Sequence, residues 1–279
     1  RILHQPFYVL SNCLLKFSHN IFLFPYSRKH ICSFFSIYDT INVNPKTTVL
    51  EIQKFSEAYF MTFTYKLPCF DLKQTAYSGQ VFRMIPAPDS ANTWVAISQG
   101  NVCLIRQEND TFFLECEPEL EDFWKNYFDL NTDYEKMVAA IKPEDHYLMA
   151  AAKAGQGIRI LRQDTWEMII TFVISQQKTI PAIRSLVEAL CSRYGTRTRS
   201  FYSFPSPDQL CQASFDDLLA LKLGYRAKYI KRICEDVCSG KLDLDRLRKL
   251  NYADSMEVLL SCYGIGVKVA NCICLFGLH

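Results

Sequence analysis

The sequence predicts an α+β protein in which an antiparallel β-sheet domain precedes an all-helical domain. Between residues 63 and 116, apolar side chains recur with a period near two and turn-forming residues interrupt the pattern. Such a pattern is typical of short antiparallel strands. After Pro118 the apolar spacing becomes helical and stays so to the end of the chain, which predicts a run of short helices. Strands and helices therefore occupy separate parts of the chain, as in α+β proteins.

The chain is expected to contain two domains and a segment that precedes them. Its 279 residues suffice for two domains with a core each. Residues 61–155 are expected to form the sheet domain with its closing helices, and residues 156–279 the helical domain. Residues 1–60 hold eight phenylalanines, no methionine and no settled period. We expect translation to start at Met61 and the preceding segment to be an extension or a gene-model artefact. A genuine short domain, with strand-like pieces such as residues 31–37, is the alternative.

Within the sheet domain, residues 93–98, 102–106 and 111–116 predict three strands of an antiparallel meander. The turns between them are marked by Gln99-Gly100 and Asn109-Asp110. Earlier in the chain, Gly79 lies between a turn and a strand. On its own this glycine predicts only a turn or a bulge.

Capping residues mark the expected helices. Helices are predicted over residues 119–128, 133–141 and 143–153, and Asp164 with Glu167 predicts a capping box that opens a helix to about Ile174. A polar interruption follows, and Pro181 predicts the start of a helix that ends at Gly195. Further helix starts are expected at Ser206, Ser214, Leu223, Asp243 and Asp254.

Near the C-terminal end, Gly264-Ile265-Gly266 separates two apolar helix patterns and predicts a helix, a tight glycine hairpin and a second helix. Glycines let backbone approach a ligand, and the N–H groups of a helix that starts near Val267 attract an anion such as phosphate. A turn that binds nothing is the simpler alternative. Lys268 would lie in the first helical turn, where the helix dipole and any burial disfavour its protonated form. Both effects would make it a better nucleophile.

Charge and cysteine usage narrow the class of protein. Residues 156–279 hold 17 of the 31 Lys and Arg but only 12 of the 29 Asp and Glu, so this half is expected to meet a polyanion. The twelve cysteines contain no Cys-x-x-Cys pair, which indicates a reduced intracellular compartment and disfavours zinc. No apolar run is long enough to span a bilayer, so a soluble protein without a membrane partner is expected.

Four stretches together resemble the 8-oxoguanine DNA glycosylase/AP lyases of the helix-hairpin-helix (HhH-GPD) glycosylase superfamily. They run over residues 77–83, 157–164 and 223–229 and the hairpin at 264–272. The resemblance covers the chain from about Met61 to His279. It implies a TBP-like N-terminal sheet followed by the glycosylase helices, and base-excision repair of duplex DNA that contains 8-oxoguanine.

The resemblance also implies roles for particular residues. Lys268 matches the catalytic lysine that attacks C1′ of the sugar, forms a Schiff base and permits β-elimination; pairing with a phosphate alone is the alternative. Gly79 matches the glycine whose carbonyl accepts a hydrogen bond from N7–H of 8-oxoguanine. Cys272 matches a cysteine packed against the flipped base, although it could equally be a buried helix cysteine.

The DNA contacts follow in the same way. Gln177 and Tyr225 are expected to fill the gap left by the flipped base, with a core aromatic as the alternative for Tyr225. Arg226 matches an arginine that bonds the widowed cytosine. Gly264 and Gly266 would approach a phosphate. Other phosphate contacts are expected from basic residues in or beside the helix that is expected to start at Leu223, namely Lys222, Lys228, Lys231 and Arg232. No cofactor is expected, except a K⁺ or Na⁺ on the main-chain oxygens of Leu260, Cys262 and Ile265.

The chain departs from the family pattern in three ways that matter. One is Asn271, which stands where some members have an acid. The family's assisting aspartate would lie beyond His279, because only eleven residues follow Lys268; we expect this chain to be truncated and inactive as written. Gln177 replaces an expected asparagine and Ala182 an expected arginine, while Arg184 points to another helix face. Loose discrimination of the opposite base is therefore predicted.

Other functions stay open at this point. They are an HhH glycosylase for another damaged base, a catalytically dead DNA-binding fragment and a structural helical protein. We expect a monomer, nucleoid-associated in the cytoplasm if the protein is bacterial and nuclear if it is eukaryotic.

Overall fold

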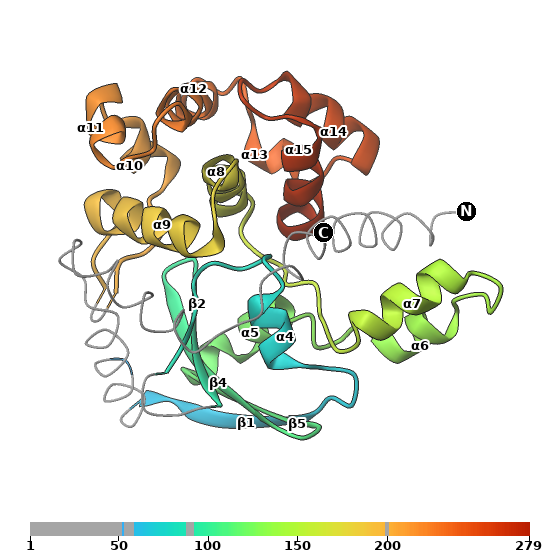
Figure 1. The fold of residues 1–279 in the computed structure, drawn as a ribbon. Coiled ribbons are helices and arrows are strands. Elements are labelled where there is room, and N and C mark those ends of the chain that lie inside the picture. Colours follow the sequence, from blue (N-terminus) through green and yellow to red (C-terminus); the bar gives the residue numbers. More distant parts are fainter. Residues whose placement is uncertain (1–51, 53–58, 88–91, 199–200) are drawn as a thin grey trace. The chain divides into compact units, whose positions relative to one another are not determined.

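The computed structural model describes residues 52, 59–87, 92–198 and 201–279 (Figure 1). These residues form two compact units. The first contains the described residues up to Ala96 together with Val102–Arg162, and the second contains Ile97–Asn101 and Gln163–His279. The predictions for residues 1–60 lie outside the described residues except at positions 52, 59 and 60.

A five-stranded antiparallel sheet forms the centre of the first unit. Its strands lie in the order β1-β5-β4-β3-β2. Their bounds are Met61–Lys66 (β1), Met84–Pro86 (β2), Thr93–Ser98 (β3), Asn101–Glu108 (β4) and Thr111–Cys116 (β5). The predicted meander is confirmed by β3, β4 and β5. It forms because alternate side chains of β5 are buried against the core while the others face outward.

One helix in this stretch was missed. The period-two pattern predicts only strands between residues 63 and 116, but Leu72–Tyr77 form the helix α4. Asp71 caps it, since its side chain accepts a hydrogen bond from the N–H of Gln74 at 2.7 Å. The helix buries Leu72, Thr75 and Ala76, a spacing of three and four residues that fits one helix face. At six residues, it is too short to produce a clear period in the sequence.

Aromatic residues fill the core of the first unit. Phe112 of β5 packs against Phe70 and Phe128 with ring centroids 5.1 and 5.4 Å apart, and the fully buried Trp124 packs on Tyr127. The remaining helices are η1 (Pro118–Leu120), α5 (Glu121–Tyr127), α6 (Tyr134–Ala139) and α7 (His146–Ala154). They match the predicted helices with shifts of a few residues at the ends.

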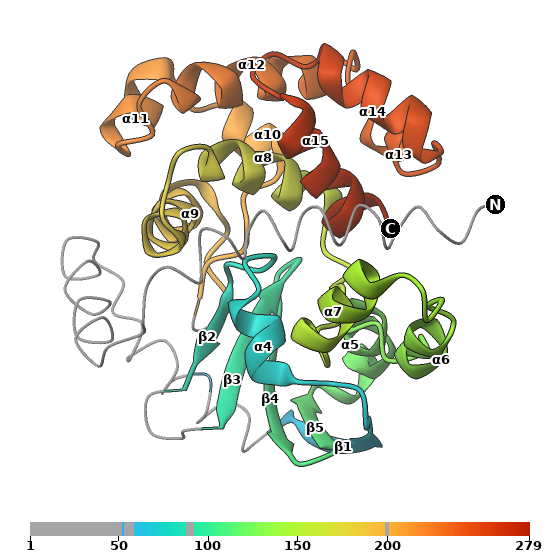
Figure 2. The same ribbon diagram turned by 45° about the vertical axis from the view of Figure 1, so that its right-hand side comes forward.

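The second unit is helical, and α8 (Thr165–Ser175) is its central element. All of its residues from Thr165 to Ile174 are buried, because α9, α12, α15 and η2 pack around it (Figure 2). The helices are α9 (Ile180–Tyr194), α10 (Pro207–Cys211), α11 (Phe215–Ala220), α12 (Arg226–Cys238), α13 (Leu244–Leu247), α14 (Tyr252–Ser261), α15 (Val267–Ile273) and the π-helix η2 (Cys274–Leu278).

Most predicted caps are confirmed. Asp164 accepts a hydrogen bond from the N–H of Glu167 at 2.8 Å, and Ser206 forms a complete capping box with Gln209. The prediction for α14 was wrong at its start, since Asn251 and not Asp254 caps this helix. The α+β class, with an antiparallel sheet followed by helices, is confirmed. Among the described residues, no helix is long and apolar enough to cross a membrane.

Candidate active site on the glycine hairpin

The predicted hairpin is present between α14 and α15, which lie side by side (Figures 1 and 2). Its sharp turn depends on Gly264, whose φ of 89° lies in the left-handed region that glycine adopts without a steric penalty. Space also requires glycine here. A Cβ at this position would lie 2.2 Å from Cγ of Tyr229, so α12 packs directly on the hairpin backbone.

Gly266 and Lys268 begin the second helix of the hairpin. Gly266 is the N-cap of α15 and contributes no side-chain cap, and a Cβ added to it would meet nothing within 4 Å. Lys268 is the second helical residue and is exposed. Its place in the first turn of α15 is as expected, whereas the expected burial is absent, because Lys268 is exposed among the described residues. The nearby side chains of Val267 and Tyr263 are also exposed, at 63% and 47%.

The polar interruption between α8 and α9 is confirmed as a turn, and Gln177 is exposed on it with a φ of 52°. Arg226 supports this turn from α12. Its Nε donates to the main-chain oxygen of Gln176 at 2.9 Å, and its Nη2 donates to the same oxygen. Arg226 is only 4% exposed and lies 4.4 Å from the ring centroid of Tyr225. Within the described part of the chain, Arg226 therefore stabilises the turn of Gln176 and Gln177. Its contact to cytosine stays a prediction.

Tyr225 is exposed by 45%, which excludes the core-aromatic alternative for this residue. It begins a row of three tyrosines that leads from α12 to the hairpin. Its ring lies 5.5 Å from that of Tyr229, which in turn lies 5.1 Å from that of Tyr263, and both contacts are edge-on. The row gives the second unit an exposed aromatic surface beside the hairpin.

The four basic residues near α12 divide into two groups. Lys222 and Lys228 are exposed, and the Lys228 amine lies 5.4 Å from the ring centroid of Tyr263. Lys231 instead donates to the carbonyl oxygens of Cys211 and Ala213 at 3.0 and 2.9 Å. Arg232 pairs with Asp236 at 3.3 Å. The expectation that all four contact phosphate is therefore corrected for Lys231, whose ammonium group is used inside the fold.

Gly79 lies in the first unit, buried in the bend after α4 with a φ of 83°. The side chain of the next residue, Gln80, hydrogen-bonds to the motif at residues 157–164. The side chain of Gln80 accepts from the N–H of Leu161 at 2.8 Å and donates to the carbonyl of Arg159 at 2.9 Å. These bonds fix the bend that presents Gly79. Residues 157–162, which the sequence assigns to the helical domain, thus hydrogen-bond within the first unit.

Cys272 of α15 is 1% exposed, so both the base-packing role and the buried-cysteine alternative fit its position. No disulfide joins cysteines within the described part of the chain. Arg184 is 3% exposed, which agrees with the prediction that it points away from the face of Ala182.

The expected cation site would use the oxygens of Leu260, Cys262 and Ile265. The Cys262 oxygen accepts a hydrogen bond from the N–H of Ile265 at 3.2 Å. Its second lone pair remains available to coordinate a cation. Leu260 belongs to the last turn of α14, where the helix dipole favours a cation. These main-chain oxygens fit a monovalent cation, whose binding stays a prediction.

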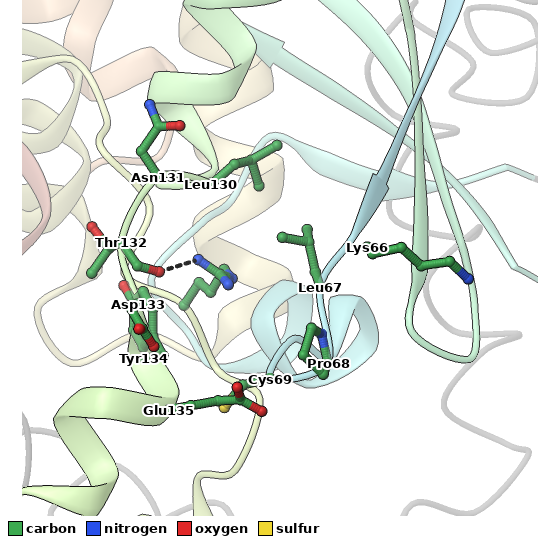
Figure 3. A pocket seen from close by; sticks show the side chains of 11 residues that line it. Lys66, Leu67, Pro68, Cys69, Leu130, Asn131, Thr132, Asp133, Tyr134 and Glu135 are labelled. Carbon is green, nitrogen blue, oxygen red and sulfur yellow. Dashed lines mark hydrogen bonds between the residues drawn. The ribbon is translucent and has the colours of Figure 1, made fainter.

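A shallow pocket of about 210 Å³ lies elsewhere in the first unit (Figure 3). Lys66, Leu67 and Pro68 line one part of it, and residues 130–135 line another. Arg159 in its wall donates to the carbonyl oxygens of Asp129 and Thr132 at 2.6 and 3.2 Å. None of the residues that the resemblance assigns to the site lines this pocket.

Sequence reasoning missed Gln176, Tyr229 and Tyr263. The side chain of Gln176 donates to the carbonyl oxygen of Gly264 at 3.0 Å, across 88 positions of the chain. No local pattern marks such a contact. The aromatic spacing of Tyr225 and Tyr229, four residues apart, could have indicated that both lie on one face of α12.

Two family models match consecutive parts of this chain. The model for the N-terminal domain of 8-oxoguanine DNA glycosylase matches residues 63–169. The model for HhH-GPD superfamily base excision DNA repair protein matches residues 170–268.

Individual relatives agree with these matches. The N-glycosylase/DNA lyase of Saccharomyces cerevisiae is 30% identical over 238 residues, which cover 75% of this chain and 63% of the yeast protein. The chain thus spans less than two thirds of that relative. The structure of MBOgg1 in complex with a low-affinity DNA ligand matches with a TM-score of 0.72 and 32% identity, over 78% of this chain and 76% of that one. The 8-oxoguanine glycosylase/lyase of Clostridium acetobutylicum, in complex with duplex DNA, matches with a TM-score of 0.71 and 28% identity, over 78% and 79% of the two chains.

Proposed function

Because the chain belongs to the 8-oxoguanine DNA glycosylase family of the HhH-GPD base-excision repair superfamily, we propose that it excises 8-oxoguanine from duplex DNA and cleaves the strand at the abasic site. The observation that carries this proposal is the exposed Lys268 directly after a glycine hairpin. Exposure lets the amine reach a sugar carbon, and the hairpin brings backbone N–H groups close to a phosphate.

The chemistry needs one nucleophile for both steps. The neutral amine of Lys268 attacks C1′, and the N–C1′ bond forms while the glycosidic bond breaks and its electron pair leaves with the base. Loss of a proton from nitrogen and opening of the sugar ring yield a Schiff base. The iminium acidifies the C2′ proton. Removal of that proton by a base forms the C2′–C3′ double bond and breaks the C3′–O bond by β-elimination, so that the downstream strand leaves with a 5′ phosphate.

Lesion recognition is proposed to rest on Gly79. A carbonyl at this buried bend can accept the N7–H of 8-oxoguanine, whereas guanine would leave the carbonyl facing the N7 lone pair. An unpaired polar group in a closed pocket costs about 1–3 kcal/mol, which is enough to favour the lesion. For the second unit, Cys272 is proposed to pack against the flipped base.

The flipped base leaves a gap in the duplex, and its extrusion costs a few kcal/mol. The exposed Gln177 and Tyr225 are proposed to occupy this gap, and Arg226 is proposed to bond the widowed cytosine. A K⁺ or Na⁺ on the oxygens of Leu260, Cys262 and Ile265 would screen the charge of a phosphate beside the hairpin. We further propose that the protein acts as a monomer.

The central test is covalent trapping. The protein is incubated with an 8-oxoguanine:cytosine duplex and borohydride, which reduces the Schiff base to a stable adduct. We expect an adduct with the wild type and none with Lys268→Gln. Release of 8-oxoguanine without an adduct would indicate a monofunctional glycosylase, and salt-dependent binding without release would indicate a DNA-binding module. An adduct that forms only with an alkylated base would identify a different lesion.

Opposite-base selectivity is a separate prediction. Ala182 has no side-chain donor, and Arg184 is buried, so α9 offers no arginine near its start for the opposite base. We expect excision rates opposite cytosine and adenine to differ by less than about tenfold, whereas a bidentate contact discriminates by about 1–3 kcal/mol. Single-turnover rates with the two duplexes measure this ratio. A steep fall opposite adenine would contradict the prediction.

A further inference from the structure

Gln176 connects the two segments that carry the candidate functional residues. Its side-chain amide donates to the carbonyl oxygen of Gly264 at 3.0 Å, and its own main-chain oxygen accepts from Arg226 at 2.9 Å. We infer that Gln176 is a positioning residue, which locks the hairpin of Lys268 to the turn of Gln177. The inference rests on the proposed function, because it assigns a role in that reaction to a residue outside the reacting groups.

On the hairpin side, one peptide group is fixed at both ends. Gly264 provides its carbonyl, which accepts from Gln176, and Ile265 provides its N–H, which donates to the Cys262 oxygen at 3.2 Å. The ring of Tyr229 lies against the same glycine. Rotation of this peptide would break both hydrogen bonds, and Lys268 follows three residues after Ile265. The side chain of Gln176 therefore restricts the backbone from which the nucleophile projects.

On the turn side, Gln177 has a left-handed backbone with a φ of 52°, a conformation that is unfavourable for a residue with a side chain. The guanidinium group of Arg226 compensates by holding the preceding carbonyl, and it also donates to the Leu223 oxygen at 3.3 Å. Arg226 is buried, so its charge needs these acceptors. The turn that presents Gln177 is thereby tied to α12.

The positioning role of Gln176 requires a side chain that both reaches the Gly264 oxygen and donates a hydrogen bond to it. A side chain that only fills space needs no donor, so substitutions can distinguish the two roles. Methionine at position 176 keeps the length and volume of glutamine but cannot donate. Glutamate keeps the shape but would set a carboxylate oxygen against the Gly264 carbonyl, which is repulsive. A packing role predicts little effect of Gln176→Met, because this variant keeps the volume. A donor role predicts that Gln176→Met is impaired and that Gln176→Glu, which also adds a charge, is impaired further.

Amide hydrogen exchange of the hairpin tests the inference without reference to activity. In the full-length protein we expect Gln176→Met to speed exchange at the Ile265 amide about tenfold, and Gln176→Glu to speed it further, because the opposing carbonyl is no longer held. Gln212→Met is the matched control, since Gln212 is an exposed glutamine at the end of α10. Exchange that stays at the wild-type rate in both variants would overturn the inference.

Kinetics supply the second measurement. Single-turnover excision of 8-oxoguanine is expected to slow about tenfold in Gln176→Met and about a hundredfold in Gln176→Glu, because misplacement of a reacting group by 1 Å can cost that much. The dissociation constant for DNA should change less than about threefold. A variant that loses binding and rate in equal measure would contradict a positioning role.

Failure of the proposed function and failure of the inference about Gln176 give different results. If the wild type releases no base, the proposed function fails, while the exchange rates still decide whether Gln176 holds the hairpin. If the wild type is active and Gln176→Met reacts at the wild-type rate, the role is packing and the inference is wrong. Should Gln176→Glu fail to fold, Gln176→Asn replaces it, because its amide is one methylene too short to reach Gly264.

Discussion

Gly264 and Gly240 both have a left-handed backbone, with φ of 89° and 75°, but their surroundings differ. A Cβ at Gly264 would lie 2.2 Å from the Tyr229 ring, whereas one at Gly240 would meet nothing within 4 Å. Alanine at either position should cost about 1–2 kcal/mol for the backbone. Gly264→Ala should cost about 1–3 kcal/mol more, because the tyrosine must move.

Thermal or urea unfolding of the two variants measures this difference. Gly240→Ala serves as the control for the backbone term, so the excess in Gly264→Ala reports the contact with Tyr229. Equal destabilisation would mean that α12 does not pack tightly on the hairpin. A second control is Gly264→Ala combined with Tyr229→Ala, which should recover the steric part.

At the scale of single residues, the sequence allowed some positions to be predicted and not others. Lys268, Gly264 and Gly266 could be predicted because a glycine pair and the resumed apolar pattern are local features. Gln176 could not, since its partner lies 88 positions away and both neighbouring glutamines look alike in the sequence. The buried state of Arg226 was also missed, because a basic residue at a helix start predicts exposure unless its acceptors are known.

Helix α12 carries two lysines with opposite uses. Lys228 is exposed beside Tyr263, whereas Lys231 donates to two carbonyl oxygens at the end of α10. We expect Lys228→Ala to weaken DNA binding and to reduce the slope of log K against log salt by about 0.9, the value for one phosphate contact. Lys231→Ala should leave the slope unchanged and lower the stability by about 1 kcal/mol.

Titration of a duplex at several salt concentrations gives the slopes, and thermal unfolding gives the stability. The two lysines lie on the same helix three residues apart, so each variant is the control for the other. A lower slope in Lys231→Ala would show that its ammonium group turns towards DNA on binding.

At the scale of elements, the sequence predicted most helices through their caps. Asp164, Ser206 and Ser214 each accept a backbone N–H three residues on, and this chemistry is visible in the sequence. Helix α4 was missed because its six residues complete fewer than two turns. Its cap, Asp71 with Gln74, was a visible indication within a stretch dominated by alternation.

At the scale of the whole molecule, the order of sheet and helices could be predicted because the two periods do not overlap along the chain. The boundary between units was harder to predict. Residues 157–162 look like the approach to α8, but Asp71 donates to the Gly157 oxygen at 2.7 Å and Arg162 to the Tyr127 oxygen at 2.9 Å. Hydrogen bonds between distant segments assign this stretch to the first unit, and no composition change marks them.

The stability of the molecule should depend on alkaline pH through buried thiols in both units. Burial, with the nearby Glu121 and Glu117, raises the pKa of Cys116 from 9.0 to about 12, and burial raises that of Cys274 to about 11. In each case the folded state holds its proton more tightly than the unfolded chain. The contribution is therefore fully present below pH 9 and is lost as the pH rises towards 11 and 12.

We expect the unfolding temperature to fall between pH 8 and pH 10, and to fall less in Cys116→Ala. The variant will be less stable at pH 8, because a buried side chain has lost its sulfur. The quantity to compare is therefore the fall in unfolding temperature between pH 8 and pH 10 in each protein. The comparison of the two proteins isolates Cys116, because the rest of the sequence is the same in both. Parallel falls in the two proteins would mean that Cys116 ionises as easily in the folded state as in the unfolded chain.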